Sequence, residues 1–288
     1  MPVHERRGSV VTIGAYDGLH LGHRRVIDEV CRLARADGLE SVVVTFDRHP
    51  ASVVRPESAP ALLTDLPQKL DLLHDTGVDD VYVVEFTPQR AAESAEDFVD
   101  EVLVGELAAR IIVVGRDFHF GRARGGDVRL LEKMGADRGF RVEPSELVTD
   151  SVAGEVVSST RIRRLVAEAD LAEAARLLGR PHEVRGLVTG EAASFSGAGE
   201  GDAGVSLALS GSILLPPAGG YEARCGLVGA EGVPLQGAHV VVPARVGAAG
   251  GGAGGEVSLA VLGVREAWPS GSPLRVLFDR PAGRTSAP

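Results

Sequence analysis

The stretch SVVTIGAYDGLHLGH, residues 9–23, joins an apolar, β-branched run directly to a glycine-rich loop that carries two histidines. Residues 9–13 predict a buried β-strand, because β-branched apolar residues suit a strand that is covered on both faces. Residues 20–38 predict an amphipathic helix, since apolar residues recur at helical spacing and the segment ends at Gly38, a helix C-cap signal. The chain therefore turns from strand to helix within the glycine-rich loop.

The same alternation of strand and helix continues to about residue 145. Further buried strands are predicted at residues 41–46, 80–86 and 110–115, and further helices at residues 65–77, 93–107 and 125–139. An alternating order of strands and helices predicts a parallel sheet with helices on both faces. We therefore expect a doubly wound, Rossmann-like α/β domain.

The sequence changes character after a helix that is predicted over residues 161–179. Short apolar runs broken by Gly, Pro and Ser follow, a pattern typical of an all-β domain. Two glycine-rich stretches, residues 196–204 and 247–255, indicate flexible loops within this part. These observations predict two domains, residues 1–181 and residues 182–288.

Composition narrows the classes of partner. The formal net charge is −10 with an isoelectric point near 5.3, which argues against nucleic acid or an anionic membrane, because both attract a basic surface. No apolar run approaches the ~20 residues that a membrane helix needs, and the first residues lack the apolar region of a signal peptide. The sequence therefore predicts a cytoplasmic protein with small-molecule partners, and it leaves a homo-oligomer open.

The chain contains two cysteines, Cys31 and Cys225, which lie far apart in the sequence. This number and spacing support neither a disulfide framework nor a cysteine-based metal site. Cys31 falls on the apolar stripe of a predicted helix, so we expect it in the core.

The glycine-rich loop has the residues of an anion site. Ligands of open parallel sheets bind beyond the carboxyl ends of the strands, where free N–H groups at a helix N-terminus attract anions. Gly14 and Gly18 allow a sharp turn, and His20 and His23 lie one helical turn apart. The pattern matches neither the dinucleotide-binding nor the P-loop signature. A phosphate site is the favoured interpretation; a plain turn with helix-capping histidines and an H-x-x-H metal site stay open.

A second cluster, SSTRIR, opens the helix predicted near residue 161. Its polar residues are Ser158, Ser159, Thr160, Arg161 and Arg163. Hydroxyls at a helix N-cap followed by arginines within one turn form another potential anion site. The alternative is an ordinary N-cap followed by a solvated basic face.

These two segments resemble known signatures. GAYDGLHLGH resembles the G-x-F-D-G-x-H-x-G-H signature of the nucleotidylyltransferase superfamily, and SSTRIR resembles its SST-x-I-R signature. With segments 45–50, 115–127 and 177–190 in the same order and spacing, the chain resembles the bacterial bifunctional riboflavin kinase/FAD synthetase family. The resemblance implies a nucleotidylyltransferase domain followed by a riboflavin-kinase-like β-barrel.

The resemblance implies FMN adenylyl transfer, with ATP and FMN as substrates and Mg²⁺ as cofactor. His20 and His23 would stabilise charge on the α-phosphate, and Arg163 is the third expected catalytic residue. The residues expected to bind the nucleotide are Gly14, Asp17, Gly18, Ser158, Ser159, Thr160 and, at a variable position of the motif, Arg161. No metal ligand is assigned to a side chain.

The resemblance also implies a flavin or ATP loop after the strand at residues 110–115. Its expected contact residues are Asp117, Phe118, Phe120 and Gly121, although a plain strand-to-loop turn is the alternative. Two positions depart from the family pattern. Tyr16 replaces Phe, and Arg48 replaces Pro in a loop on the presumed flavin side, where it either changes the acceptor or is a surface residue.

The second domain lacks the kinase motif G-F-P-T-A-N of the family, although residues 216–225 and 272–284 match other strands of the kinase barrel. Ser206 and Ala208 align with its Thr and Asn, and an alanine has no donor atom for a metal. Glu256 is the candidate for the general base of the kinase. We therefore expect FMN adenylyltransferase activity with absent or very weak riboflavin kinase activity. A nucleotidylyltransferase with another acceptor or nucleotide, and a non-catalytic flavin- or nucleotide-binding regulator, are the alternatives.

Overall fold

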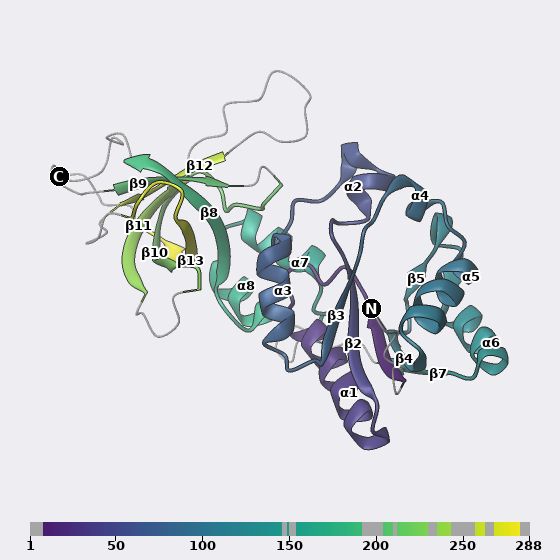
Figure 1. Cartoon of the computed structure of the whole chain (residues 1–288). Helices are drawn as coiled ribbons and strands as arrows, with labels where there is room; N and C mark the ends of the chain where they lie inside the picture. Colours follow the sequence, from purple (N-terminus) through teal and green to yellow (C-terminus); the bar gives the residue numbers. More distant parts are fainter. Residues whose placement is uncertain are drawn as a thin grey trace, which may run out of the picture. The chain divides into compact units, whose positions relative to one another are not determined.

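The computed structural model of the chain describes residues 8–145, 149, 154–191, 204–209, 212–229, 235–242, 257–262 and 268–282 (Figure 1). Contacts within the chain divide it into two compact units. The first comprises Met1–Pro60 and Leu66–Val157, and the second comprises Ala61–Asp65 and Ser158–Pro288. Each unit is described by itself below.

The first unit is built on a parallel five-stranded sheet of order β3-β2-β1-β4-β7. The strands are β1 (Ser9–Ile13), β2 (Glu40–Phe46), β3 (Asp80–Val84), β4 (Ala109–Gly115) and β7 (Arg141–Ser145). Val11 of β1 lies opposite Val42 on one side and Ile112 on the other. All five residues of β1 are buried, as expected for a central strand covered on both faces. The predicted α/β fold and its first four strands are confirmed, but β3 was predicted to be buried and instead lies at the edge of the sheet, where Val84 alone of its five residues is buried.

Helices cover both faces of this sheet. The helical segments are α1 (Leu21–Asp37), α2 (Ala51–Val54), η1 (Pro56–Ser58), α3 (Leu66–His74), α4 (Pro88–Ala91), α5 (Ala95–Phe98), the π-helix η2 (Val99–Glu106), η3 (Arg122–Arg124) and α6 (Val128–Arg138). Val10 and Ile111 pack with α1 on one face, whereas Val11 and Ile112 pack with α5, η2 and α6 on the other. Cys31 is buried, as expected.

Three elements differ from the sequence-based expectation. Strand β7 was not predicted, because its sequence RVEPS is mostly polar and lies at the edge of the sheet, where a proline is tolerated. The helix expected over residues 93–107 consists of a short α-helix that continues as a π-helix. The single helix expected over residues 161–179 is wrong. It is split into α7 (Ser159–Ala167) and α8 (Leu171–Leu178).

Ala169 and Asp170 cause that split. Ala169 has a positive φ of 59°, which no α-helix accommodates. The side chain of Asp170 then accepts a hydrogen bond from the backbone N–H of Glu173 and caps α8. Apolar spacing alone does not reveal this break, because both helices bury the same kind of face.

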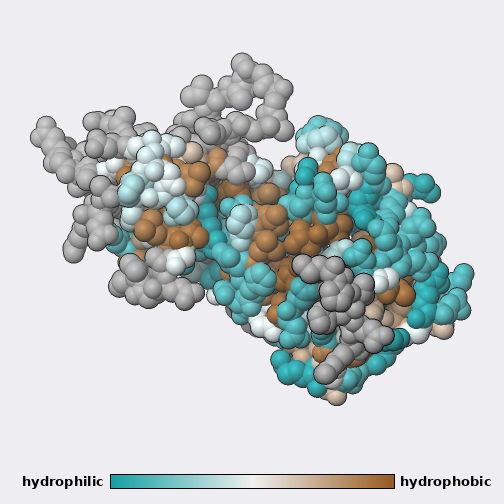
Figure 2. All heavy atoms as spheres, viewed as in Figure 1, coloured by the Kyte–Doolittle hydropathy of each residue, from teal (hydrophilic) through white to brown (hydrophobic). Residues whose placement is uncertain are grey.

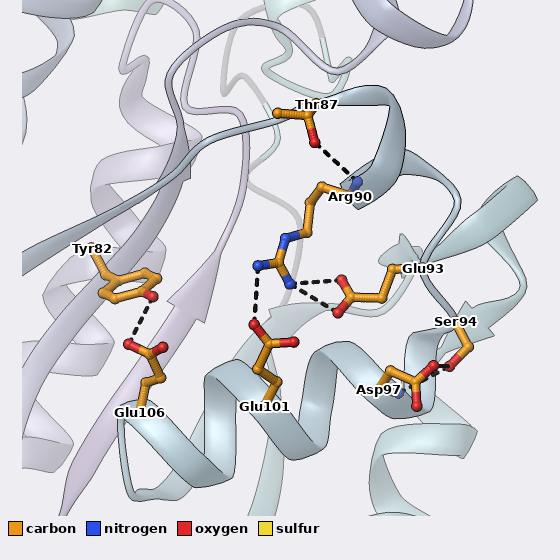
Figure 3. Close-up of polar contacts among 8 residues, drawn as sticks. All are labelled: Tyr82, Thr87, Arg90, Glu93, Ser94, Asp97, Glu101 and Glu106. Atoms are coloured by element: carbon orange, nitrogen blue, oxygen red, sulfur yellow. Dashed lines mark hydrogen bonds and ion pairs between the residues drawn. The ribbon is translucent and has the colours of Figure 1, made fainter.

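A polar network fixes the short helices that follow β3 (Figure 3). The guanidinium of Arg90 donates to both carboxylate oxygens of Glu93, at 2.8 and 2.9 Å, and to Glu101 at 3.2 Å. The Thr87 and Ser94 side chains cap α4 and α5. Around it, the described surface of α4, α5 and α6 is largely hydrophilic (Figure 2). The network therefore holds this solvent-facing side of the unit in place.

The second unit is a closed barrel of order β10-β11-β12-β9-β8-β13. The strands are β8 (His182–Glu191), β9 (Gly204–Leu209), β10 (Gly219–Leu227), β11 (Gln236–Val242), β12 (Val257–Leu262) and β13 (Pro273–Pro281), paired antiparallel. The barrel encloses an apolar core to which Leu171 of α8 also belongs. The predicted second β-domain is confirmed.

The α7–α8 pair and residues 61–65 group with the barrel. Leu62 forms a β-bridge with Ile213, and α8 contacts β8 and β13. The boundary predicted at residue 181 stays a prediction, because compactness does not report which segment folds independently. The glycine-rich stretches 196–204 and 247–255 lie outside the described residues except for Gly204. Among the helices that are described, none is long and apolar enough to span a membrane.

Gly121 is predicted to be intolerant of a side chain. Its φ is 71°, and a Cβ there would lie 2.7 Å from the backbone of Ala95. Gly121→Ala should lower the free energy of unfolding by about 1 kcal/mol for the positive φ and a further ~1–3 kcal/mol for the clash. Gly77→Ala is the matched control, because its φ is 76° and no atom lies within 4 Å of the added Cβ. Equal losses in urea unfolding would contradict the close approach.

Candidate active site

The histidine-bearing loop, residues 14–20, follows β1, the strand at which the order of strands in the sheet reverses. The chain winds outward from β1 to β2 and β3, then returns to place β4 on the other side of β1. The loops after β1 and β4 therefore leave neighbouring parallel strands at the same edge. Ligands of open α/β sheets bind at this kind of switch point. The position predicted for the loop at residues 14–20 is thus the position that the fold favours for a ligand.

The backbone of this loop is strongly bent. Tyr16, Gly18 and Leu19 have positive φ angles of 49°, 80° and 34°. For residues other than glycine, such conformations cost about 1–3 kcal/mol each and concentrate at functional sites. Gly14 donates to the Val44 carbonyl at 3.0 Å, and Leu19 donates to the Tyr16 carbonyl at 3.2 Å. The surrounding structure therefore holds a turn that the local sequence alone would not prefer.

The two histidines lie against each other at the N-terminus of α1. Their rings stack with centroids 3.6 Å apart and planes 16° apart. His20 is buried and is the N-cap of α1, where its Nδ1 accepts a hydrogen bond from the His23 backbone N–H at 3.3 Å. An accepting Nδ1 requires the tautomer with hydrogen on Nε2. The hydrogen bond therefore assigns a hydrogen to Nε2 of His20, and both imidazoles lie at a helix N-terminus, where backbone N–H groups favour anions.

Close packing fixes both rings. A Cβ on Gly22 would lie 3.1 Å from the imidazole of His20. The ring of Tyr16 meets that of His23 edge-on, with centroids 5.0 Å apart. The capping role considered for the histidines is therefore present at His20, and it coexists with the arrangement expected of a phosphate site.

Tyr16 anchors the loop to its own strand. Its hydroxyl and that of Thr12 are 2.7 Å apart, and both residues are buried. Burial raises the pKa of the Tyr16 phenol above its ordinary value, an effect that the hydrogen bond with Thr12 opposes in part. The phenol consequently stays neutral across the physiological range.

Sequence reasoning missed Lys69, which lies beneath the loop. This α3 residue is only 7% exposed, and its ammonium donates to the carbonyls of Ala15 and Phe46. Asp17, predicted as a loop residue, is also buried. The only signal in the sequence was that Lys69 is one of two lysines in a chain with thirty basic residues.

Arg48 lies on the surface. It pairs with its neighbour Asp47 at 2.7 Å, and its side chain is 54% exposed. Asp47 also accepts a hydrogen bond from the Phe86 backbone N–H at 2.8 Å, and these contacts outweigh burial and lower the pKa of its carboxyl. The contacts of Arg48 are therefore those of a surface residue, the second of the two alternatives. An influence of Arg48 on the choice of acceptor stays a prediction.

The loop after β4 is held by aromatic packing. Phe120 is buried against Phe98, with ring centroids 6.1 Å apart, and stacks on Phe118 at 5.4 Å. Gly121 gives the close approach described above, whereas Asp117 is exposed. The aromatic pair thus supports the loop from the core side, and Asp117 is its exposed carboxylate.

The SSTRIR cluster lies in the second compact unit. Ser158 is the N-cap of α7 and accepts from the backbone N–H of Arg161. The Arg161 side chain pairs with Glu173 of α8 at 3.1 Å and is only 10% exposed. Arg163 donates through Nε to the carbonyl of Ala61 at 2.8 Å. Thr160 is exposed, and Ser159 is partly exposed. The N-cap alternative is therefore present at Ser158, and Arg161 has a structural role.

The aligned kinase positions lie on β9 of the barrel. Burial alternates along this strand, with Val205, Leu207 and Leu209 buried. Ser206 and Ala208 therefore face the opposite side from the barrel core. Glu256 lies outside the described residues. Within the described part of the chain, no three or more His, Cys, Asp and Glu side chains are grouped so as to hold a metal ion.

This arrangement defines the class of protein: a doubly wound α/β unit with a histidine-bearing loop at its switch point, followed by a β-barrel. Residues 3–161 match the family model described as FAD synthetase. Because that match covers more than half of the chain, the chain belongs to the FAD synthetase family.

Curated relatives agree with this assignment. The chain is 40% identical over 184 residues to a bifunctional riboflavin kinase/FMN adenylyltransferase from Pseudomonas fluorescens, and 37% identical over 183 residues to one from Escherichia coli (strain K12). In both comparisons the alignment covers 64% of this chain and 58% of the relative. The alignment thus spans less than two thirds of these relatives.

A solved structure supports the fold. The crystal structure of a macrolide-efflux protein from Streptococcus pneumoniae matches with a TM-score of 0.74, over 99% of this chain and 90% of that chain. The sequences are 23% identical, so the likeness concerns the fold alone.

The hydroxyl pair of Thr12 and Tyr16 should contribute measurably to stability. Tyr16→Phe leaves the buried Thr12 hydroxyl without this partner, which should cost about 1–2 kcal/mol in the free energy of unfolding. Adding Thr12→Val should cost less than the sum of the single changes, because both polar groups are then absent. Tyr82→Phe is the control, since its partner Glu106 lies at the surface. Additive effects in urea unfolding would argue against the bond.

Proposed function

We propose that this chain is an FMN adenylyltransferase. A terminal phosphate oxygen of FMN attacks the α-phosphorus of ATP in line. A new P–O bond forms, the bond from the α-phosphorus to the α,β-bridging oxygen breaks, and FAD and pyrophosphate leave. The observation that carries the proposal is the stacked His20–His23 pair at the N-terminus of α1, directly beyond the central strand. Membership of the FAD synthetase family supports the same reaction.

Charge stabilisation is the chemistry that this loop supplies. Phosphoryl and nucleotidyl transfer depend on positioning and on neutralising negative charge rather than on a protein nucleophile. In the proposal, His20 and His23 contact the α-phosphate, while Gly14, Asp17 and Gly18 shape the loop around it. Backbone N–H groups of the first turn of α1 add to the positive potential there.

The SSTRIR residues would hold the β- and γ-phosphates. Ser158, Ser159 and Thr160 supply hydroxyls at the start of α7, and Arg163 supplies a cation in its first turn. Arg163 donates through Nε to the carbonyl of Ala61, and its guanidinium keeps its positive charge at any physiological pH. Arg161 pairs with Glu173 of α8, so we assign it mainly to holding α7 against α8 and rank it below Arg163 as a phosphate ligand.

Mg²⁺ is expected to arrive with ATP. Magnesium commonly keeps several waters and binds phosphate oxygens rather than a cage made only of protein side chains. When bound, it would neutralise charge on the departing pyrophosphate.

A cytoplasmic location and a homo-oligomer stay predictions.

Removing either imidazole should abolish most turnover while ATP still binds. We expect His23→Ala and His20→Asn to lower kcat by about 10²–10³-fold, the usual cost of losing a donor to developing charge. Asn is chosen at position 20 because it keeps an N-cap for α1. Production of FAD from FMN measures turnover, and calorimetry measures ATP binding. His74→Ala, at the exposed end of α3, is the control. Unchanged kcat in both variants would refute the assigned roles.

We further propose that riboflavin kinase activity is absent or very weak. The supporting observation is the sequence of β9, where Ala208 aligns with the metal-binding Asn of the kinase motif and Ser206 with its Thr. Purified protein with ATP and Mg²⁺ should convert FMN to FAD but should form no FMN from riboflavin. Phosphorylation of riboflavin at a rate near that of FAD formation would overturn the claim. Turnover of another acceptor in preference to FMN would instead indicate the alternative nucleotidylyltransferase.

A further inference from the structure

Lys69 hydrogen-bonds to the end of β2 and to the loop that follows β1. Its Nζ lies 2.7 Å from the carbonyl oxygen of Phe46, the last residue of β2, and 3.3 Å from that of Ala15 in the histidine-bearing loop. The Thr45 hydroxyl also donates to Ala15, at 3.3 Å. Carbonyls beyond the ends of parallel strands have no ladder partner, so buried ones require another donor. Lys69 therefore supplies donors to the end of β2 and to the loop that leaves β1.

A lysine suits this position better than an arginine. A single compact ammonium carries three donors and can serve two carbonyls at once, whereas the planar guanidinium fixes its donors in a fork. Only Lys69 and Lys133 are lysines among the thirty basic residues, and Lys133 is exposed on α6. The buried position beside these two carbonyls thus holds a residue type that the chain otherwise hardly uses.

The surroundings of Lys69 make its charge easy to remove. Burial lowers the pKa of the ammonium to about 8, against the opposing attraction of Asp17 and Asp47. Asp17 belongs to the histidine-bearing loop, and Asp47 follows β2 and pairs with Arg48. Charge-assisted hydrogen bonds are about twice as strong as neutral ones. Loss of the proton therefore weakens both carbonyl bonds and leaves the two carboxylates without this counter-charge.

We propose that Lys69 is a positioning residue for nucleotidyl transfer: its ammonium fixes the Ala15 carbonyl, and through it the loop that places His20 and His23. The role in catalysis rests on the proposed function, whereas the fixing of the loop does not. Between Ala15 and His20 the chain passes through the strained residues Tyr16 and Leu19. A strained segment keeps its conformation only when its surroundings over-determine it, so removing the ammonium should release the loop.

Hydrogen exchange tests the fixing of the loop without reference to activity. The full chain is compared as wild type, Lys69→Met, Lys69→Arg and Lys133→Met, and peptides that cover residues 14–20 are followed. We expect Lys69→Met to speed exchange there by about tenfold or more, the change that loss of one charge-assisted bond would produce. Lys133→Met should match the wild type, and peptides of β4 report global unfolding. Unchanged exchange at the loop in a folded Lys69→Met protein overturns the proposal.

The pH dependence of turnover tests the link to catalysis. Because the pKa of Lys69 in the folded chain is about 8, the ammonium loses its proton as pH rises through 8, and kcat should fall there to a lower plateau. Misplacement of a catalytic group costs up to roughly 10²-fold in rate, with KM for ATP changing less. In Lys69→Arg the cation persists, so this fall should be absent. A wild-type profile that is flat across pH 8, or an equal fall in Lys69→Arg, overturns the positioning role.

The outcomes separate this inference from the proposed function. If the wild type makes no FAD from FMN, the proposed function fails while the exchange experiment still decides whether Lys69 holds the loop. If Lys69→Met does not fold, the wild type alone is measured at pH 7 and pH 9.5, with rates corrected for intrinsic exchange. Faster corrected exchange of residues 14–20 at the higher pH supports the proposal, and equal rates overturn it.

Discussion

The turn from β1 into α1 is the constraint on which the rest of the candidate site depends. Of residues 16–19, three have positive φ: Tyr16, Gly18 and Leu19. This conformation is sterically unfavourable for Tyr16 and Leu19, which carry side chains. The conformation persists because hydrogen bonds tie the loop to β2 at Gly14, and to both β2 and α3 at Ala15. A packed parallel sheet is rigid enough to impose this geometry. The histidine pair is thus placed by long-range contacts rather than by its own segment.

This dependence explains what the sequence could and could not predict. β-branched runs predicted four strands correctly: the central strands β1, β2 and β4 are apolar on both faces, and edge strand β3 also carries a β-branched run. Edge strand β7 has no such run, and the break at Ala169 depends on a single φ that periodicity does not encode. The α/β order also placed the histidine loop correctly at a helix N-terminus, since that follows from the order of elements alone.

The candidate site shows the same limit. Motif spacing pointed to His20, His23 and the SSTRIR residues, but it gave no indication of what else each side chain contacts. Arg161 pairs with Glu173, and Arg163 bonds to Ala61, contacts that depend on where distant segments pack. Lys69 escaped notice because a buried lysine between two carbonyls has no local sequence signature. Tertiary contacts, which a single sequence does not display, account for these differences.

Each compact unit carries one of the two sequence segments that resemble nucleotidylyltransferase signatures. The first holds the histidine loop and the Phe118–Phe120 loop at the carboxyl ends of adjacent strands. The second holds the SSTRIR cluster on α7, which groups with a barrel whose core is apolar.

The fate of the ATP phosphates tests the central claim most directly. The protein is incubated with FMN, Mg²⁺ and ATP labelled with phosphorus-32 at either the α- or the γ-position, and the products are separated. Adenylyl transfer predicts that the α-label appears in the flavin product and the γ-label in pyrophosphate, in equal amounts. Label from the γ-position in a flavin, or release of inorganic phosphate without a labelled flavin, would contradict the account.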